Sequence, residues 1–189
     1  MIKQKLHINN MICDCCIKVV EMELSNILVK VDSIKLGEVN ISFDPTTISI
    51  EDIERVLNSN GFSLLVDKDD ILVENIKRAI IDLVHHTTYN AMVRNSDYIV
   101  GKFNKTYPYL SSLFSKYEGI TLEKYIILQK IEKVKSLIQD DEITLSEIAF
   151  MMGYSSVQYL STQFKNITGI SVSEFKKSPA KHRKSIDKV

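Results

Sequence analysis

Three cysteines lie within four positions near the N-terminus, at Cys13, Cys15 and Cys16. Cys13 and Cys16 have the CxxC spacing, with which two thiols on a loop that opens a helix can point at one ion. A helix N-terminus lowers the pKa of a thiol and so favours the thiolate, which binds a metal or attacks a disulfide. Thiolates are soft ligands that select Cu(I), Zn(II) and similar ions. The spacing predicts a soft-metal site, and a redox pair is the alternative.

Three neighbours of this pair are candidates for additional metal ligands or for residues that contact the ligands. Asp14 offers a hard carboxylate and Cys15 a third thiol. Two thiolates suffice for Cu(I), whereas Zn(II) takes four ligands and would need Asp14, Cys15 or a second chain. Met11 carries a soft thioether, which we interpret as a plug in the core under the loop.

The residues around the thiols predict a small α+β unit. Residues 5–9 alternate polar and apolar side chains, as in a half-buried strand, and residues 17–27 carry apolar side chains on one helical face. Two further strands flank Gly37 as a hairpin, a helix begins at Ser49, and residues 62–66 form a short last strand. The order βαββαβ is the split βαβ, or ferredoxin-like, plan.

Three motifs of this unit resemble the heavy-metal-associated domain of copper chaperones and metal-transporting ATPases, over roughly residues 3–67. They are Met11-x-Cys13-x-x-Cys16, Phe43-Asp44-Pro45 and Gly61-Phe62. The resemblance implies that Cys13 and Cys16 are the metal ligands and that Phe62 lies on the loop facing them. Asn10 and Ile12 replace the Gly and Thr that are usual in the family.

Residues 71–86 are predicted to form a connecting helix. Its apolar stripe packs on its own chain or on a second copy, in a homodimer formed through residues 71–84. We interpret His85 and His86 as solvated or helix-end cations, because adjacent helical residues point about 100° apart. The stripe consists of Leu72, Ile76, Ala79 and Leu83, widened by Val73 and Ile80.

The back half predicts an all-α unit in which a helix, a tight turn and a second helix occur twice. Leu110-x-x-Leu113-Phe114 and Leu160-x-x-Gln163-Phe164 occupy equivalent places in this repeat. The helix between the two units covers residues 121–138 and is roughly 27 Å long at 1.5 Å per residue. This length is near the ~34 Å that separates successive major-groove segments on one face of DNA. The remaining predicted helices cover residues 97–103, 107–117 and 156–166, with capping boxes at Thr144-x-x-Glu147 and Ser171-x-x-Glu174.

The second unit closely resembles the DNA-binding domain of AraC-type regulators, over about residues 96–178. The resemblance is carried by Ile148-Ala149-x-x-x-Gly153-Tyr154-Ser155-x-x-x-Tyr159-Leu160-x-x-x-Phe164-Lys165-x-x-x-Gly169-x-Ser171-x-x-x-Phe175, and by Tyr107-Pro108-Tyr109-Leu110-Ser111-x-Leu113-Phe114 in the first unit. Val172 and Lys130 depart from the family's usual Pro and Arg.

The resemblance implies which residues face double-stranded DNA in the major groove. Bases are faced by Pro108, Ser111 and Ser112 from the first recognition helix and by Val157, Gln158 and Thr162 from the second, and Ser161 completes the DNA-binding set. Gln158 suits an adenine edge, and neither recognition helix carries an Arg for the strong guanine contact. Phosphates are faced by Lys116, Ser155, Ser156 and Lys165.

The net charge of zero, from 24 basic and 24 acidic residues, hides an asymmetry. Residues 1–70 hold 7 basic and 12 acidic residues, net −5, whereas residues 96–189 hold 14 and 10, net +4. The 44% hydrophobic content is that of a globular protein and excludes wholesale disorder. Apolar runs are too short for a membrane span. Residues 1–5 lack the apolar stretch of a signal peptide, so we expect a cytoplasmic protein.

These observations predict a bacterial-type transcription regulator, not an enzyme, whose DNA affinity responds to Cu(I) or Zn(II) at Cys13 and Cys16. Two alternatives are a front domain that serves as a dimerisation or interaction module, and a thiol redox switch. No carboxylate pair, Ser/His/Asp set or phosphate loop favours another catalytic chemistry, so no catalytic residue is assigned. The predicted ranges are 1–68 for the heavy-metal-associated-like domain, 69–95 for the connector, 96–178 for the DNA-binding domain and 179–189 for a basic tail.

Overall fold

The computed structural model describes residues 1–87 and 94–177, and the chain divides into two compact units, residues 1–75 and 76–189. The boundary falls inside a helix, α3, so the segment that we predicted as a connector contributes to both units. The break predicted at residues 88–90, the stop at Pro179 and the basic tail lie outside the described residues.

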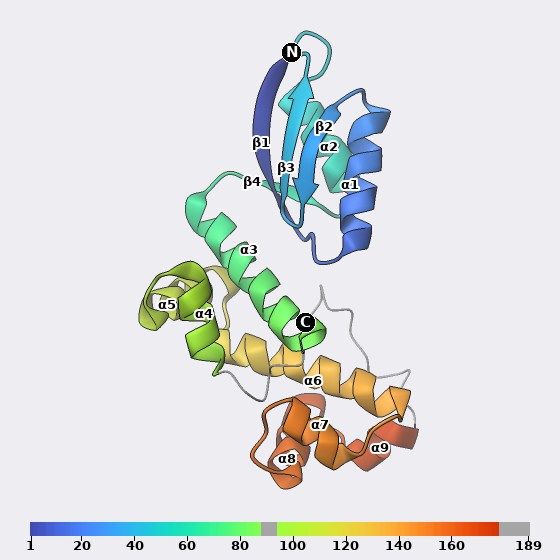
Figure 1. The fold of residues 1–189 in the computed structure, drawn as a ribbon, viewed down its shortest axis with the longest axis vertical. Coiled ribbons are helices and arrows are strands. Elements are labelled where there is room, and N and C mark those ends of the chain that lie inside the picture. The colour runs from blue at the N-terminus through green and yellow to red at the C-terminus, as the bar shows by residue number, and fades with distance from the viewer. Residues whose placement is uncertain (88–93, 178–189) are drawn as a thin grey trace. The chain divides into compact units, whose positions relative to one another are not determined.

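The N-terminal unit has the predicted order βαββαβ (Figure 1). The four strands form an antiparallel sheet in the order β2-β3-β1-β4, so the first and third strands lie in its centre. The elements are β1 (Ile2–Asn9), α1 (Asp14–Asn26), β2 (Lys30–Lys35), β3 (Glu38–Phe43), α2 (Ile50–Ser59) and β4 (Ser63–Leu65). The small sheet domain expected from the sequence is therefore confirmed.

Local sequence signals set the ends of these elements. Gly37 has φ 76° between β2 and β3, in the left-handed region that glycine adopts without steric cost. Ser49 caps α2 by accepting a hydrogen bond from the Asp52 N–H, and the Asp52 carboxylate accepts one from the Ser49 N–H. This reciprocal pair satisfies two N–H groups that the first turn leaves without helical partners.

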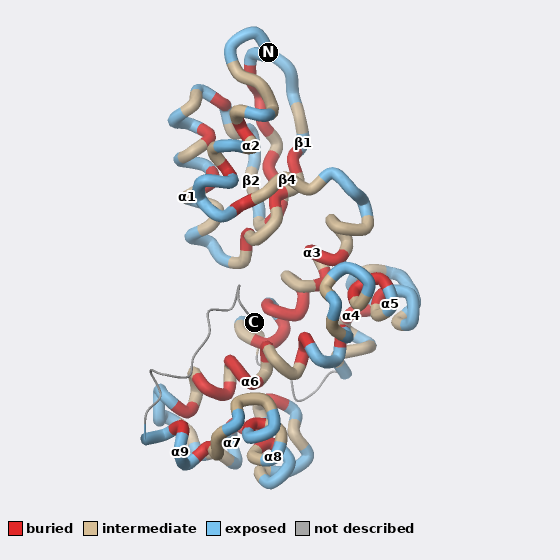
Figure 2. Tube along the Cα trace, turned by 180° about the vertical axis from the view of Figure 1, so that it is seen from behind, coloured by how far each residue is buried: buried red, intermediate tan, exposed pale blue. Residues whose placement is uncertain are grey.

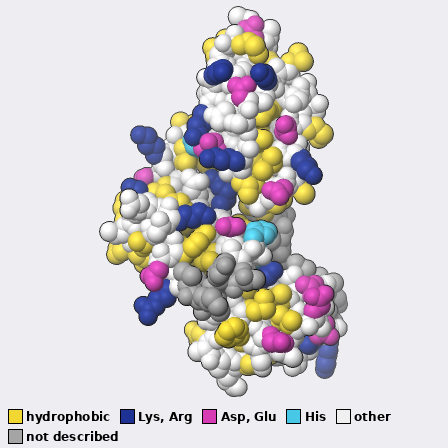
Figure 3. Space-filling view, viewed as in Figure 1, with side chains coloured by type: hydrophobic (Ala, Val, Ile, Leu, Met, Phe, Trp, Pro, Cys, Tyr) yellow, Lys and Arg dark blue, Asp and Glu magenta, His cyan; other side chains and the backbone are white. Residues whose placement is uncertain are grey.

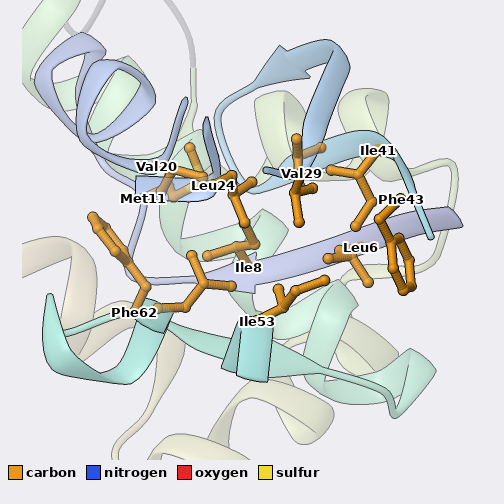
Figure 4. Packing of buried hydrophobic residues seen from close by; sticks show 12 residues of the cluster. Leu6, Ile8, Met11, Val20, Leu24, Val29, Ile41, Phe43, Ile53 and Phe62 are labelled. Atoms are coloured by element: carbon orange, nitrogen blue, oxygen red, sulfur yellow. The ribbon is translucent and has the colours of Figure 1, made fainter. Parts of the chain in front are cut away.

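The core of this unit lies between the sheet and the two helices, whose buried positions line their inner faces (Figure 2). Figure 4 shows Met11 and Phe62 at one end of this core. Met11 is fully buried, which agrees with its interpretation as a core plug, and Phe62 is 7% exposed. The thiol loop is therefore anchored by an apolar side chain two positions before Cys13.

Helix α3 (Lys68–Ile81) continues into a single π-helical turn, η1 (Asp82–His86). Ile76, Ala79 and Leu83 of the predicted stripe are buried within the chain. Packing on its own chain is one of the two alternatives that the stripe predicted, and a homodimer through residues 71–84 stays a prediction.

The C-terminal unit contains two helix-turn-helix pairs on either side of a long helix, α6 (Leu122–Asp140). Its buried positions run along most of its length (Figure 2). The first pair is α4 (Asn95–Phe103) and α5 (Tyr107–Glu118); the second is α7 (Leu145–Met151) and α8 (Val157–Thr168), followed by α9 (Val172–Lys177). None of the helices in the described ranges has the length and apolar character that a membrane span requires.

Candidate nucleic-acid interface and thiol site

Each helix-turn-helix pair turns through one residue in the left-handed conformation. Asn104 has φ 50° between α4 and α5, and Gly153 has φ 70° between α7 and α8. Asn and Gly are the residues that tolerate this region best. Leu110 and Phe114 of α5 are fully buried, as are Leu160 and Phe164 of α8, so each second helix exposes its opposite face.

The exposed face of α5 carries the residues expected to contact DNA. Pro108, Ser112 and Lys116 are exposed at a spacing of four, so they lie on one helical face. Ser111 is half-buried, and its carbonyl accepts a hydrogen bond from Ser115 Oγ at 2.8 Å. Lys116 Nζ lies 5.0 Å from the centre of the Tyr117 ring, which restrains this ammonium through a cation–π contact.

The exposed face of α8 is more polar. Gln158, Thr162 and Lys165 are exposed, whereas Val157 and Ser161 are half-buried. The Thr162 hydroxyl donates to the Gln158 carbonyl at 2.9 Å, so Thr162 keeps only acceptor capacity for a ligand in this arrangement.

Ser155 and Ser156 are exposed in the turn before α8. Ser156 caps the helix by accepting the Tyr159 N–H at 3.1 Å, which leaves its hydroxyl proton available to a phosphate. The capping role of Ser156 was not predicted from the sequence.

Side chains behind α8 hold it in place, and the sequence did not reveal these contacts. Lys130 Nζ donates to the Met152 carbonyl at 2.8 Å, at the end of α7, and burial lowers the pKa of Lys130. The Tyr154 hydroxyl donates to Gln163 Oε1 at 2.6 Å, and burial raises the pKa of Tyr154. These two bonds fix the turn that precedes the second recognition helix.

A polar chain links η1 to the middle of α6. His85 Nε2 lies 3.0 Å from Gln129 Oε1, and Gln129 Nε2 donates to the Tyr125 hydroxyl at 3.1 Å. Burial lowers the pKa of His85 against a smaller opposing effect from Gln129. His85 and His86 lie at a helix end as predicted, but the interpretation of His85 as solvated is wrong, because its ring is half-buried and hydrogen-bonded; His86 is exposed.

The thiol loop brings Cys13 and Cys16 together at the start of α1. Their sulfurs lie 3.5 Å apart, Cys13 is exposed, and Cys16 is half-buried. Cys13 is the N-cap residue of α1, so its thiol lies beside the N–H groups of the first turn. Cys16 Sγ lies 4.0 Å from the carbonyl oxygen of Asn10, a distance at which the thiol donates weakly to it.

The two thiols differ in acidity. Slight burial raises the pKa of Cys13, but hydrogen bonds from Cys16 and Cys15 outweigh it and lower the pKa overall. Burial raises the pKa of Cys16, and the neighbouring Cys13 raises it further. Cys13 is therefore the thiol of the pair that loses its proton more readily.

The additional ligand candidates do not join this pair. Asp14 and Cys15 are exposed, and the described residues contain no group of three His, Cys, Asp or Glu that could hold a metal. Cys15 follows Cys13 by two helical positions, which is about 200° around α1. The 3.5 Å sulfur separation is close to the ~3.8 Å that two thiolates at 2.3 Å from a tetrahedral Zn(II) require. The donor set present fits a soft ion held by two sulfurs.

Residues 99–178 match the family model described as a helix-turn-helix domain. The match agrees with the two helix-turn-helix pairs that the C-terminal unit contains. The chain is 29% identical over 105 residues to the Msm operon regulatory protein of Streptococcus mutans, covering 56% of this chain and 36% of that protein.

A second relative is the uncharacterized HTH-type transcriptional regulator YtdP of Bacillus subtilis, 26% identical over 132 residues. The match covers 68% of this chain and 17% of YtdP, so the chain spans only a minor part of either relative. The C-terminal domain of AraT, a response regulator from Geobacillus stearothermophilus, has the same fold: its TM-score is 0.50 at 22% identity, over 63% of this chain and 92% of that domain.

Proposed function

We propose that this protein is a sequence-specific DNA-binding transcription regulator that reads two adjacent major-groove segments with α5 and α8. The observation that carries the proposal is the exposed face that each second helix repeats, with Pro108, Ser112 and Lys116 on α5 and Gln158, Thr162 and Lys165 on α8. Helix α6 between the units has 19 residues and is about 28 Å long, which suits adjacent segments on one DNA face.

Direct base readout is modest, and Gln158 is its strongest contributor. A Gln amide bonds the N6 and N7 positions of adenine, whereas Ser and Thr accept several bases. Basic and acidic side chains are interspersed on the face shown in Figure 3. DNA affinity therefore depends on the fit of α5 and α8 in the grooves as well as on a mild electrostatic attraction.

Selection of bound fragments from a random DNA library tests this function. We expect a consensus with two half-sites about 10 base pairs apart and an affinity that falls with salt in proportion to the phosphates contacted. A control with Gln158→Ala and Thr162→Ala combined should lose the second half-site and keep non-specific binding. Salt-independent or absent binding would contradict the proposal.

A soft metal ion at Cys13 and Cys16 modulates this DNA binding. The close sulfurs and the acidic Cys13 thiol support this part of the proposal, and a ferredoxin-like, heavy-metal-associated identity of the N-terminal unit agrees with its topology. An ion can change DNA affinity only if it binds the DNA-competent state with a different affinity. DNA affinity measured with Zn(II), with Cu(I) and with a chelator tests it, and Cys13→Ser/Cys16→Ser is the control. Identical affinities under all three conditions would refute metal sensing and leave DNA binding untouched.

The unequal acidity of the thiols also favours a second candidate, a redox switch. Oxidation by a disulfide-containing reagent such as oxidised glutathione would join Cys13 and Cys16, transferring two electrons to the reagent and releasing two thiols from it. Thiol titration in glutathione buffers at cytosolic potentials distinguishes the candidates. Fully reduced thiols under these conditions would exclude the switch, and a disulfide that forms while zinc fails to bind would favour it.

A further inference from the structure

Glu74, a buried carboxylate on α3, holds the thiol loop through Asn10. We propose that Glu74 is a positioning residue. Through Glu74, a displacement of the thiol loop shifts α3, and along that helix the shift reaches the contact of α3 with α5. The inference rests on metal binding at Cys13 and Cys16 and adds the route by which that binding reaches the helix-turn-helix domain.

Asn10 is the residue where the contacts of the loop converge. Its φ of 68° lies in the left-handed region, which residues other than glycine rarely adopt. Its N–H donates to Glu74 Oε1 at 3.3 Å, and its side-chain Nδ2 donates to the Gly61 carbonyl at 3.1 Å. Its own carbonyl is the group that faces Cys16 Sγ. One peptide segment therefore connects a metal-ligand candidate with α3.

Glu74 is placed for this role by its burial. Glu74 is only 5% exposed. Carboxylates are rarely buried in this way unless they are hydrogen-bonded. Its partner Asn10 is 64 positions away in the chain, so the contact ties α3 to the loop rather than to its own neighbours. Asp70, one turn earlier on the same helix, is half-buried and provides a matched control.

The second half of α3 belongs to the C-terminal unit and contacts a recognition helix. Ile76, Ala79 and Ile80 are fully buried. Lys77 Nζ pairs with Glu118 Oε1 at 3.3 Å, and Glu118 is the last residue of α5. Glu74 and Lys77 are three positions apart and so lie on the same helical face. The contacts run from Cys16 through Asn10 and Glu74 along one turn of helix to the end of α5.

A metal ion held by both sulfurs would widen their 3.5 Å separation towards ~3.8 Å, and so would shift Cys16 Sγ by a few tenths of an ångström at most relative to the Asn10 carbonyl. The Asn10 peptide then adjusts, and its N–H carries the adjustment to Glu74. Because packed elements shift between discrete arrangements instead of deforming continuously, a small displacement at the loop can bias the position of α3.

Amide chemical shifts of the isotopically labelled full chain, titrated with Zn(II), test this relay. In the wild type, the amides of residues 10–17 and those of residues 76–81 should both shift. Glu74→Leu fills the space without an acceptor; it should keep the shifts of the loop and lose those of residues 76–81. Glu74→Gln retains an acceptor oxygen and should behave like the wild type, as should Asp70→Ala.

Each other outcome refutes a defined part of the inference. If residues 76–81 of the wild type stay unchanged while the loop shifts, or if Glu74→Leu shifts them as the wild type does, the relay is refuted. A loop that does not respond to Zn(II) or Cu(I) refutes metal binding and the relay together. If both regions respond but DNA affinity does not, metal-dependent regulation fails while the positioning role of Glu74 stands.

Discussion

The two helix-turn-helix pairs share one framework but define their helix ends differently. In the second pair, Thr144 and Glu147 form a capping box on α7, and the Ser156 hydroxyl caps α8. In the first pair, neither Arg94 nor Thr106 makes a side-chain cap hydrogen bond. Helix α5 instead places Pro108 in its first turn, where a missing N–H costs nothing. The second pair is therefore specified more locally than the first.

Both pairs also contact neighbouring helices. The Tyr107 hydroxyl donates to Glu123 Oε1 at 2.6 Å, and the Phe114 ring packs on Tyr125 of α6 at 5.2 Å between centroids. In the second pair, Phe164 packs on Phe175 of the following helix at 5.5 Å. The aromatic contacts of the two pairs are therefore equivalent, and the difference between the pairs lies in the side-chain caps of their helices.

The largest expected effect comes from the equivalent core rings. Phe114→Ala and Phe164→Ala should each lower the free energy of unfolding of the domain by about 3–5 kcal/mol, because both side chains are fully buried and each truncation leaves a cavity. Urea unfolding followed by circular dichroism measures the loss. Phe→Leu at each position, which removes less volume, should cost less; a loss below about 1 kcal/mol for either Ala variant would contradict the equivalence.

The two pairs should differ in base readout. Gln158→Ala should lower affinity for the selected site by about 1–3 kcal/mol and relax the preference at one base pair, since it removes a bidentate amide. The equivalent residue of the first pair, Pro108, has no donor, so Pro108→Ala should leave base preference unchanged. Fluorescence anisotropy with single-base variants of the site measures both. Equal loss of specificity in the two variants would overturn the asymmetry.

Removing the hydroxyl at the N-cap should destabilise the second pair more than the first. Thr144→Ala deletes a capping hydroxyl and should cost about 1 kcal/mol of unfolding free energy. Thr106→Ala removes a hydroxyl that caps nothing, so its cost should stay within about 0.5 kcal/mol. Thermal and urea unfolding of both variants decides the point. The same cost at both positions would show that α5 is capped as strongly as α7.

Acid should lower the stability of the first helix-turn-helix pair slightly more than that of the second. The folded pKa of His85 is lowered, so the unfolded chain binds more protons between that pKa and the ordinary value of about 6.5. Stability from neutral His85 is complete above about pH 6.5 and is lost as pH falls through the folded pKa. His85 meets α6 through Gln129 and Tyr125, which packs on Phe114.

Hydrogen exchange at pH 7.5 and 5.5 measures this effect. Amides of α5 should lose more protection than those of α8 at the lower pH, and His85→Gln, whose amide does not titrate, should remove the difference. Equal loss in both helices, or the same loss in His85→Gln, would assign the acid response to other groups.

Periodicity and turn residues predicted most helices and strands to within a few positions. The capping boxes at Thr144 and Ser171 are observed, and Gly37 lies in the predicted hairpin. These features depend on residues close in the chain, so their chemistry is visible in the sequence. The CxxC spacing likewise predicted the approach of two sulfurs on a helix start.

The sequence left the packing of the α3 stripe open and misplaced the side chain of His85 in solvent, for a common reason. A stripe is apolar whether it packs on its own chain or on a second copy, and only the fold shows that Ile76, Ala79 and Leu83 are already covered. An imidazole is a cation or a neutral partner according to its burial, and the contact with Gln129 joins residues 44 positions apart.

The sequence by itself determined where helices and strands begin, which faces are apolar, and which two thiols and which exposed side chains can meet a ligand. The tertiary structure alone decided that Asn10 adopts a left-handed conformation held by Glu74, that Lys130 caps the end of α7, and that α3 contributes to both units. Local signals act over three or four residues, whereas these contacts join residues 22 to 64 positions apart, whose meeting depends on how the whole chain packs.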